Sequence, residues 1–125
     1  MEERRFRQLI VWQRAMALNI EVHRLAKGLK GRDRAELADQ IRRAALSIPA
    51  NIAEGNGRSH RADYLRFLSI ANGSLSELDS HLEVARCLEY LAPDSLTVAL
   101  DLLDHTGRLL TRLILALRKP PTPHP

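Results

Sequence analysis

The 125-residue sequence is poor in cysteine, in aromatic residues and in long apolar runs. Its single cysteine, Cys87, excludes an internal disulfide, and small secreted chains more often carry paired cysteines. The first residues are charged and lack the apolar stretch of a signal peptide, and no run approaches the roughly 18 apolar residues of a membrane-spanning helix. We therefore expect a cytoplasmic protein without a membrane segment.

The sequence also lacks the sustained alternation of apolar and polar residues that is typical of β-strands. Four segments instead repeat apolar residues at steps of three and four, the spacing of residues on one face of a helix. These segments cover about 7–29, 33–57, 60–90 and 95–117. We predict an all-α protein whose residues 1–117 form an antiparallel up-down four-helix bundle. Residues 118–125 are rich in proline, and we expect a polyproline-like tail.

The apolar lines of the four segments are the predicted core. They are Leu9, Trp12, Met16, Leu18, Val22, Leu25 and Leu29 in the first; Leu37, Ile41, Ala44, Ile48 and Ile52 in the second; Tyr64, Leu68, Ala71, Leu75, Leu78, Leu82 and Ala85 in the third; and Leu96, Leu100, Leu103, Gly107, Leu110, Ile114 and Leu117 in the fourth. The third line is a heptad seam, which is typical of helices packed in a bundle.

The second segment contains Pro49, which removes a backbone donor and crowds the carbonyl group four residues earlier. We predict a kink near Ala45 and not a break, because the apolar period continues through Ile52. Asp33 is a candidate N-cap of this helix, and Gly55-Asn56-Gly57 is expected to end it.

The fourth segment has more leucines than one core face can bury. Leu102, Leu109, Leu113 and Leu115 lie off its apolar line. We predict that this surplus forms a subunit interface of a homo-oligomer. The alternative is that these leucines lie at the margin of the core.

Positive charge is concentrated in the first half of the chain. Lysine and arginine number 19 against 15 aspartate and glutamate, and residues 1–62 hold 13 basic and 7 acidic side chains. Guanidinium groups bind phosphates as well as carboxylates, so this surplus suits nucleic acid or a protein partner. The candidate phosphate contacts are Lys30, Arg32, Arg34, Arg42, Arg43, Arg58 and Arg61.

The pattern of an active site is missing from the sequence. A dinuclear metal site in a bundle needs Glu three residues before His, and none of the five histidines has it. The pairs Glu77 with His81 and Asp101 with His105 are expected to make surface hydrogen bonds, and Cys87 is expected to pack. We predict no enzymatic activity, no metal and no cofactor; a helical nuclease or metalloenzyme would need a polar constellation facing one cleft.

Several motifs together resemble a known family. Residues 46–58, LSIPANIAEGNGR, resemble the signature of the small proteins encoded in intervening sequences of bacterial large-subunit ribosomal RNA genes. The strings VWQRA at 11–15, QIRRA at 40–44, FLSIANGSLSEL at 67–78 and LEYL at 88–91 resemble its other blocks, so that the likeness covers roughly residues 6–117. The link at 31–34 lacks the proline expected there and is more basic, and the proline-rich tail is extra.

The resemblance implies a four-helix bundle that assembles into ring-like pentamers. It also implies a relation to accessory proteins of diversity-generating retroelements, which pair with a reverse transcriptase and bind nucleic acid through a basic surface. No enzymatic activity comes with the family.

The motif residues are expected to serve the architecture of the bundle. Ser47 and Asn51 lie one turn apart beside Pro49, where a polar side chain or water can bond the freed carbonyl group. Gly73 in mid-helix indicates close approach of another helix. The complete set of structural motif residues is Trp12, expected to cap the core, Ser47, Pro49, Asn51, Glu54, expected to pair with Arg58, Gly55 and Gly73.

Our leading hypothesis is therefore a non-catalytic oligomeric adaptor that binds RNA or DNA phosphates through its basic residues, with a reverse transcriptase as a candidate partner. The alternative is a protein-interaction scaffold that does not bind nucleic acid. The small number of aromatic residues argues against recognition of specific single-stranded sequences.

Overall fold

The computed structural model describes the backbone of residues 2–119 and the side chains of residues 5–119; most of the predicted proline-rich tail, residues 120–125, lies outside this range. The described backbone forms helices and no strand. Two short 3₁₀ helices, η1 (Glu2–Gln8) and η2 (Pro93–Leu96), accompany four α-helices, which are α1 (Ile10–Lys27), α2 (Arg32–Asn56), α3 (Arg61–Cys87) and α4 (Thr97–Arg118). The predicted all-α fold is confirmed.

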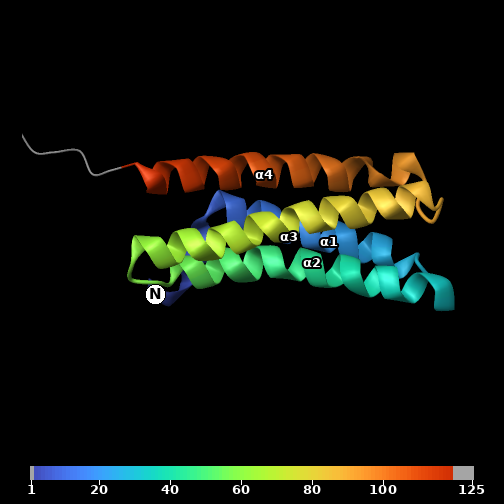
Figure 1. Cartoon of the computed structure of the whole chain (residues 1–125), viewed down its shortest axis with the longest axis horizontal. Helices are drawn as coiled ribbons and strands as arrows, with labels where there is room; N and C mark the ends of the chain where they lie inside the picture. Colours follow the sequence, from blue (N-terminus) through green and yellow to red (C-terminus); the bar gives the residue numbers. More distant parts are fainter. Residues whose placement is uncertain (1, 120–125) are drawn as a thin grey trace, which may run out of the picture.

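The four long helices lie side by side and alternate in direction, so the chain forms an up-down bundle (Figure 1). Each helix packs against its neighbour in the chain, and α4 returns to pack against α1. Consequently η1, the α2–α3 link and the end of α4 meet at one end of the bundle, and the α1–α2 and α3–α4 links meet at the other (Figure 1). Within the described range, no helix combines the length and hydropathy that crossing a membrane requires.

The predicted core is correct along α2 and α3, and it is wrong at one position each in α1 and α4. All predicted positions of α2 and α3 are buried or half-buried. In α1, however, Met16 is exposed while Ala15 and Asn19 are buried, and in α4 Leu100 is exposed while Thr106 is buried. Small and polar residues also line these two faces, so a pattern of large apolar residues misses Ala15, Asn19 and Thr106.

The surplus leucines of α4 lie mainly at the margin of the core. Leu102, Leu109 and Leu113 are half-buried and pack against it, because α4 contacts both α1 and α3. Leu115 is exposed. The surplus therefore follows largely from packing within one chain, and only Leu115 keeps the character predicted for an interface.

Helix α2 runs through Pro49 without a break, as predicted. Pro49 cannot donate to the carbonyl oxygen of Ala45, one turn earlier. Asn19 of α1 replaces this donor, because its Nδ2 lies 2.6 Å from that oxygen and 3.0 Å from the carbonyl oxygen of Ala15. A polar side chain thus bonds the freed carbonyl group, as expected, but it is Asn19 and neither Ser47 nor Asn51. Asn51 donates to the carbonyl and hydroxyl oxygens of Ser47, and the Ser47 and Ser74 hydroxyl groups are hydrogen-bonded at 2.7 Å. The kink near Ala45 stays a prediction.

Close helix approach occurs at Gly55 and not at Gly73. A Cβ atom at Gly55 would lie 2.9 Å from both Phe67 Cβ and Tyr64 Cδ1, so α3 packs directly on the backbone of α2 there. Gly73 is exposed and has nothing within 4 Å of the position of a Cβ atom. The role predicted for Gly73 is thus wrong, since its residue faces solvent rather than another helix.

The predicted N-cap at Asp33 is also wrong. Helix α2 begins one residue earlier, at Arg32, with Gly31 as its N-cap at a φ of 101° and no side-chain capping bond. Such a positive φ suits glycine, which has no Cβ to clash with the backbone. Asp33 instead lies in the first turn, where its negative charge favours the helix dipole.

Candidate nucleic-acid interface

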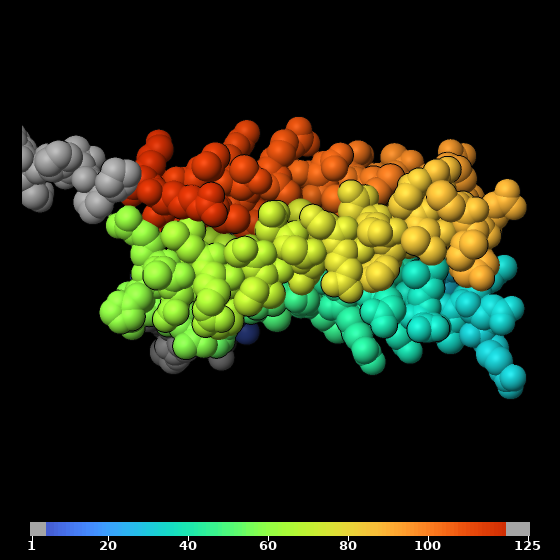
Figure 2. All heavy atoms as spheres, viewed as in Figure 1, coloured from blue at the N-terminus to red at the C-terminus, as the bar shows by residue number. Residues whose placement is uncertain are grey.

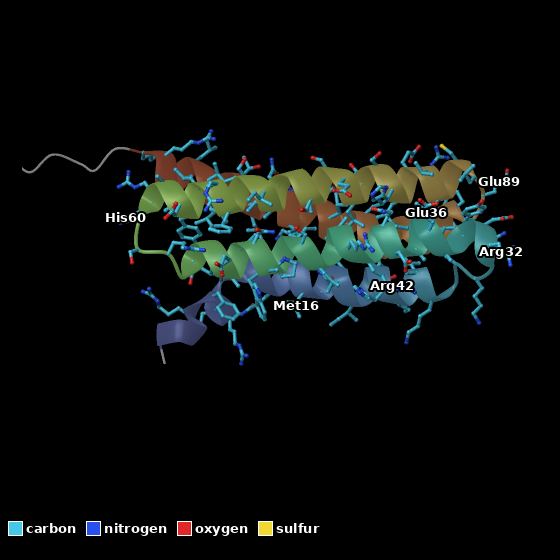
Figure 3. All side chains as sticks on the ribbon, turned by 60° about the horizontal axis from the view of Figure 1, so that its bottom comes forward. Met16, Arg32, Glu36, Arg42, His60 and Glu89 are labelled. Atoms are coloured by element: carbon cyan, nitrogen blue, oxygen red, sulfur yellow. The ribbon has the colours of Figure 1, made fainter. Side chains whose placement is uncertain are left out.

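The structure separates the seven predicted phosphate contacts into three groups along α2. Lys30, Arg32 and Arg34 lie at the end of the bundle that holds the α1–α2 link, where Figure 3 labels Arg32. Arg42 and Arg43 lie in the middle of α2, and Arg58 and Arg61 lie beyond its other end. Because the 25 residues of α2 span about 37 Å at 1.5 Å each, the seven do not form a single patch.

The richest concentration of positive charge lies where the α2–α3 link, η1 and the end of α4 meet. We call it the basic end, and its members are Arg5, Arg7, Arg58, Arg61, Arg66, Arg118 and Lys119. Arg5 and Glu54 line the same hollow, of about 470 Å³, between η1 and α2. Arg61 Nη1 donates to the carbonyl oxygen of Lys119 at 3.2 Å, which ties the start of α3 to the end of α4.

Two of these arginines, Arg58 and Arg66, stack on the ring of Phe67. The guanidinium carbons of Arg58 and Arg66 lie 4.8 Å and 4.4 Å from the centre of its ring, within the range of a cation–π contact. Arg58 also pairs with Glu54, and Arg66 Nε lies 4.0 Å from Asp63 Oδ1. Stacking restricts both side chains, so each has less rotamer entropy left to lose than a freely rotating arginine.

The other five cations of the basic end make no ion pair with a described side chain. Arg5, Arg7, Arg61, Arg118 and Lys119 have no carboxylate within 4.0 Å among the side chains of residues 5–119. All five are exposed to solvent. The basic end therefore presents a surface of uncompensated positive charge.

The other two groups hold fewer cations. Arg42 lies 3.3 Å from Asp39, although its neighbour Arg43 is exposed and without an ion-pair partner in the described part of the chain. Arg34 stacks on Tyr90 at 4.5 Å, beside a hollow of about 240 Å³ that Asp33 and Glu36 line. Two carboxylates therefore lie near the cations at that end, although none is within 4.0 Å of Lys30, Arg32 or Arg34 among the side chains of residues 5–119.

Sequence reasoning missed five members of the basic end: Arg5, Arg7, Arg66, Arg118 and Lys119. They come from three segments that are distant in the sequence and meet only because the helices alternate in direction. These five residues could have been grouped in advance, because each lies near a predicted helix end and the up-down topology brings those ends together.

Trp12, another predicted motif residue, is half-buried and packs against the core, with its ring centre 5.3 Å from that of Phe6. Through this contact Trp12 packs η1 against the bundle, and η1 carries Arg5 and Arg7. Asn56 donates to the hydroxyl group of Tyr64 at 3.1 Å and joins the end of α2 to α3. These contacts give the basic end a defined shape.

Four pairs of charged or titratable residues elsewhere in the described range lie along single helices. His81 and Glu77 lie 3.2 Å apart, as their spacing suggests, and the structure contains no group of three metal-ligating side chains within the described range. Cys87 is exposed and contacts Arg86 and Glu83, so the expectation that it packs is wrong. The hydrogen bond from Arg86 lowers the pKa of Glu83, and Arg24 lowers that of Glu21 in the same way.

Comparison with known proteins gives a family and a structural neighbour. Residues 7–112 match the model of a family described as 23S rRNA-intervening sequence protein. The chain is also similar to a crystal structure from Bacteroides thetaiotaomicron VPI-5482, described as a protein with unknown function from the S23 ribosomal protein family, with a TM-score of 0.76 and 25% sequence identity over 84% of this chain and 98% of that one. No curated protein matches.

Proposed function

The chain belongs to the 23S rRNA-intervening sequence protein family, and we propose that it is a non-catalytic oligomeric adaptor that binds the phosphates of RNA or DNA. The observation that carries this proposal is the basic end, where cations from three segments gather with few carboxylates beside them. Arginine suits this task because its planar guanidinium binds phosphate oxygens in pairs.

The proposed binding is independent of base sequence. Phe67, the aromatic residue at the centre of the basic end, is half-buried and already stacked against Arg58 and Arg66. Its ring is therefore occupied by guanidinium groups rather than free for a nucleic-acid base. Contacts to phosphates alone hold the backbone and carry no direct sequence information.

Oligomerisation would strengthen such binding. In a ring-like oligomer, a pentamer by resemblance, each subunit presents one basic end, so weak contacts add through effective concentration. We extend the proposal to a partner, a reverse transcriptase, also by resemblance. A reverse-transcriptase gene beside the gene of this protein would support a specialised accessory role, and binding of the two purified proteins would test it.

A titration with fluorescently labelled RNA and duplex DNA of mixed sequence, followed by anisotropy at several salt concentrations, tests the proposal. The logarithm of the affinity should fall linearly with the logarithm of the salt concentration, since phosphate binding releases counterions. Arg61→Glu and Arg118→Glu should each weaken binding to all sequences and reduce the salt slope by about 1.

Arg32→Glu is the matched control, because it makes the same charge change at the opposite end of the bundle. It should keep a clearly larger share of the affinity than either variant of the basic end. Absence of binding at low salt, or binding that salt does not weaken, would refute the proposed function.

The alternative, a protein-interaction scaffold, is favoured by exposed apolar side chains on α1 and α2, notably Ile20 and Leu46. A scaffold would assemble normally and ignore nucleic acid in the same titration. The two functions are thus separated by one experiment.

A further inference from the structure

A hollow of about 470 Å³ lies between η1 and α2 at the basic end. Figure 3 shows η1 beside the last turns of α2, on the side of the bundle that this view brings forward. Ala50, Ala53 and Gly57 line the hollow and carry a methyl group or no side chain, so they leave space beside the helix. The volume lies within the range of about 300–1,000 Å³ that is usual for sites of small organic molecules.

Phe6 of η1 gives this hollow an aromatic wall. Its ring is half-buried, and Trp12 meets it edge to face at 68°, a geometry that holds the ring in place. The guanidinium carbon of Arg7 lies 5.9 Å from the ring centre, at the outer limit of a cation–π contact, whereas Arg66 lies 4.4 Å from that of Phe67. Cations therefore cover Phe6 less than Phe67, and a flat ring inside the hollow can stack against Phe6.

Three polar side chains line the same hollow, namely Arg5, Glu54 and Asn56. Arg5 has no carboxylate within 4.0 Å among the side chains of residues 5–119, so its charge is available to a phosphate. The negative charge of Glu54 is offset by its pair with Arg58. Asn56 uses its Nδ2 atom to bond Tyr64, which leaves its Oδ1 atom as an acceptor. The hollow thus combines one cation with two groups that accept hydrogen bonds.

This combination matches a nucleotide whose base is unpaired. The guanidinium group of Arg5 suits the phosphate, and the ring of Phe6 suits the flat face of the base. Every base carries an N–H donor on the edge that it uses in base pairing, so the oxygens of Glu54 and Asn56 suit that edge. A base within a duplex is stacked on both faces and bonded along this edge, and the hollow therefore fits single strands only.

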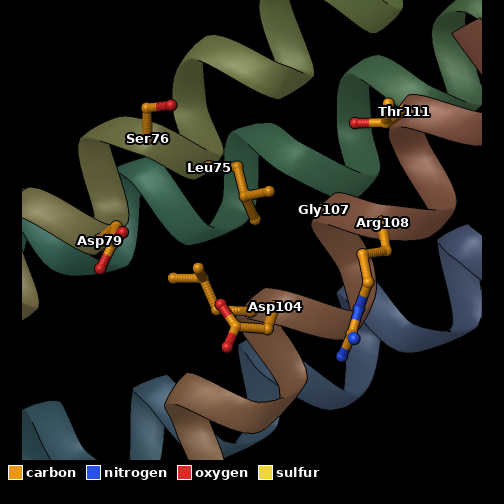
Figure 4. Close-up of a pocket in the computed structure, with 8 residues that line it drawn as sticks. Leu75, Ser76, Asp79, Asp104, Gly107, Arg108 and Thr111 are labelled. Atoms are coloured by element: carbon orange, nitrogen blue, oxygen red, sulfur yellow. The ribbon is translucent and has the colours of Figure 1, made fainter.

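Hollows along the sides of the bundle lack this combination. The groove between α3 and α4 (Figure 4) is lined by Asp79, Asp104 and Arg108 and by no aromatic residue, and its two carboxylates would repel a phosphate. Figure 2 shows α3 and α4 side by side across this face of the molecule. The hollow beside Tyr90 has an aromatic ring, but Arg34 is stacked on it.

We propose that the hollow between η1 and α2 binds one unpaired base of single-stranded RNA or DNA, while the arginines of the basic end hold the phosphates on either side. The inference deepens the proposed function and rests on it, because it names the kind of nucleic acid that the basic end prefers. Stacking and a bond to an N–H donor are open to every base, so the hollow adds a preference for single strands and none for sequence.

Two ligands and one pair of substitutions provide the test. The ligands are a labelled DNA single strand of mixed sequence and an abasic strand of equal length, which keeps the sugars and phosphates but has no bases. By anisotropy at low salt, the wild type should bind the strand with bases at least about fivefold more tightly. Ala50→Leu with Ala53→Leu fills the hollow and removes no charge, so this variant should bind both strands with the affinity and salt slope of the wild type for the abasic strand.

Ala17→Leu with Ala35→Leu is the matched control, because it makes the same changes at one half-buried and one exposed alanine outside the hollow and should keep the preference for bases. Circular dichroism checks that every variant is folded. Phe6→Leu, which removes the aromatic ring but keeps an apolar contact with Trp12, replaces the filled variant if that one unfolds, and it should also lose the preference.

Equal binding of the two strands by the wild type, or a filled hollow that keeps the wild-type preference, would overturn the inference. If both strands bind equally and salt weakens both, the proposed phosphate binding stands and the base site alone fails. If neither strand binds at low salt, the proposed function fails and the base site fails with it.

Discussion

At the scale of single residues, Asn19 decides how a proline fits inside the bundle. It is a buried polar side chain on an otherwise apolar face, and its amide group bonds the carbonyl oxygen of Ala45 that Pro49 leaves without a donor. Its own Oδ1 atom is buried without a partner among the described residues. An unsatisfied buried acceptor costs free energy. Asn19 satisfies the carbonyl oxygen of Ala45 and links α1 to α2, but its own Oδ1 becomes the unsatisfied acceptor.

A double-mutant cycle tests this role. Asn19→Ala should lower the free energy of unfolding by about 1–3 kcal/mol, because the Ala45 carbonyl oxygen is then buried without a donor. In the Pro49→Ala background the same change should cost less, since the N–H group of residue 49 can now bond that oxygen. Urea unfolding of the four proteins gives the coupling energy.

Asn72→Ala, an exposed change on α3, is the control and should leave the unfolding free energy within about 0.5 kcal/mol of the wild type. An equal cost of Asn19→Ala in both backgrounds would show that the amide does not replace the donor lost at Pro49.

At the scale of helices, the glycines Gly55 of α2 and Gly73 of α3 have opposite consequences. Gly55 allows α3 to pack on the backbone of α2, whereas Gly73 on α3 faces open space. Sequence alone predicted the reverse, because Gly73 interrupts a helical pattern whereas Gly55 opens a Gly-Asn-Gly run typical of a helix end. The neighbouring helix, and not the glycine itself, distinguishes them.

The two alanine variants should therefore change stability in opposite directions. Gly73→Ala should raise the free energy of unfolding by about 0.5–1 kcal/mol through better helix propensity. Gly55→Ala should lower it by about 1–3 kcal/mol, because Tyr64 and Phe67 must move away from the new methyl group. Thermal and urea unfolding of both proteins make the comparison; a stabilising Gly55→Ala would contradict the close packing of α2 and α3.

Ion pairs along the helices make stability depend on pH. The hydrogen bond from Arg24 holds the pKa of Glu21 below its ordinary value of 4.5, against the opposing effect of burial. A carboxyl group whose pKa is lower in the folded state stabilises the fold above its unfolded pKa and loses that effect as the pH falls through the folded pKa. Arg24→Gln should return the pKa of Glu21 toward 4.5 and flatten the fall in stability below that pH.

NMR titration of the Glu21 carboxyl group, combined with unfolding at several pH values, measures both effects. The pair of Arg86 with Glu83, which also lowers the carboxyl pKa, is unaffected by this change and serves as the internal control. A Glu21 pKa that stays low in Arg24→Gln would show that another group holds it down.

At the scale of the whole molecule, the alternating direction of the helices sorts charge into separate regions. Arginines from η1, α3 and the end of α4 gather at the basic end, whereas Asp79, Asp104 and Arg108 line the groove between α3 and α4. The proposed phosphate binding therefore belongs to one end of the bundle and not to its sides.

Much of the fold was determined by the sequence itself. The repeat of apolar residues at steps of three and four is a local property, so it placed all four helices, and the seam from Tyr64 to Ala85 is buried as predicted. The same local pattern wrongly placed Met16 of α1 and Leu100 of α4 in the core and missed Ala15, Asn19 and Thr106. An apolar period does not reveal which small or polar residues face a neighbouring helix.

Only the tertiary structure decided which distant residues meet. The bond from Asn19 to Ala45, the contact of Gly55 with Phe67 and the gathering of the basic end all join residues from different helices. These contacts depend on the rotation and relative height of packed helices, which one helix's periodicity does not encode. The sequence determined the helices and their inward faces, while packing decided where charge, close contacts and open grooves lie.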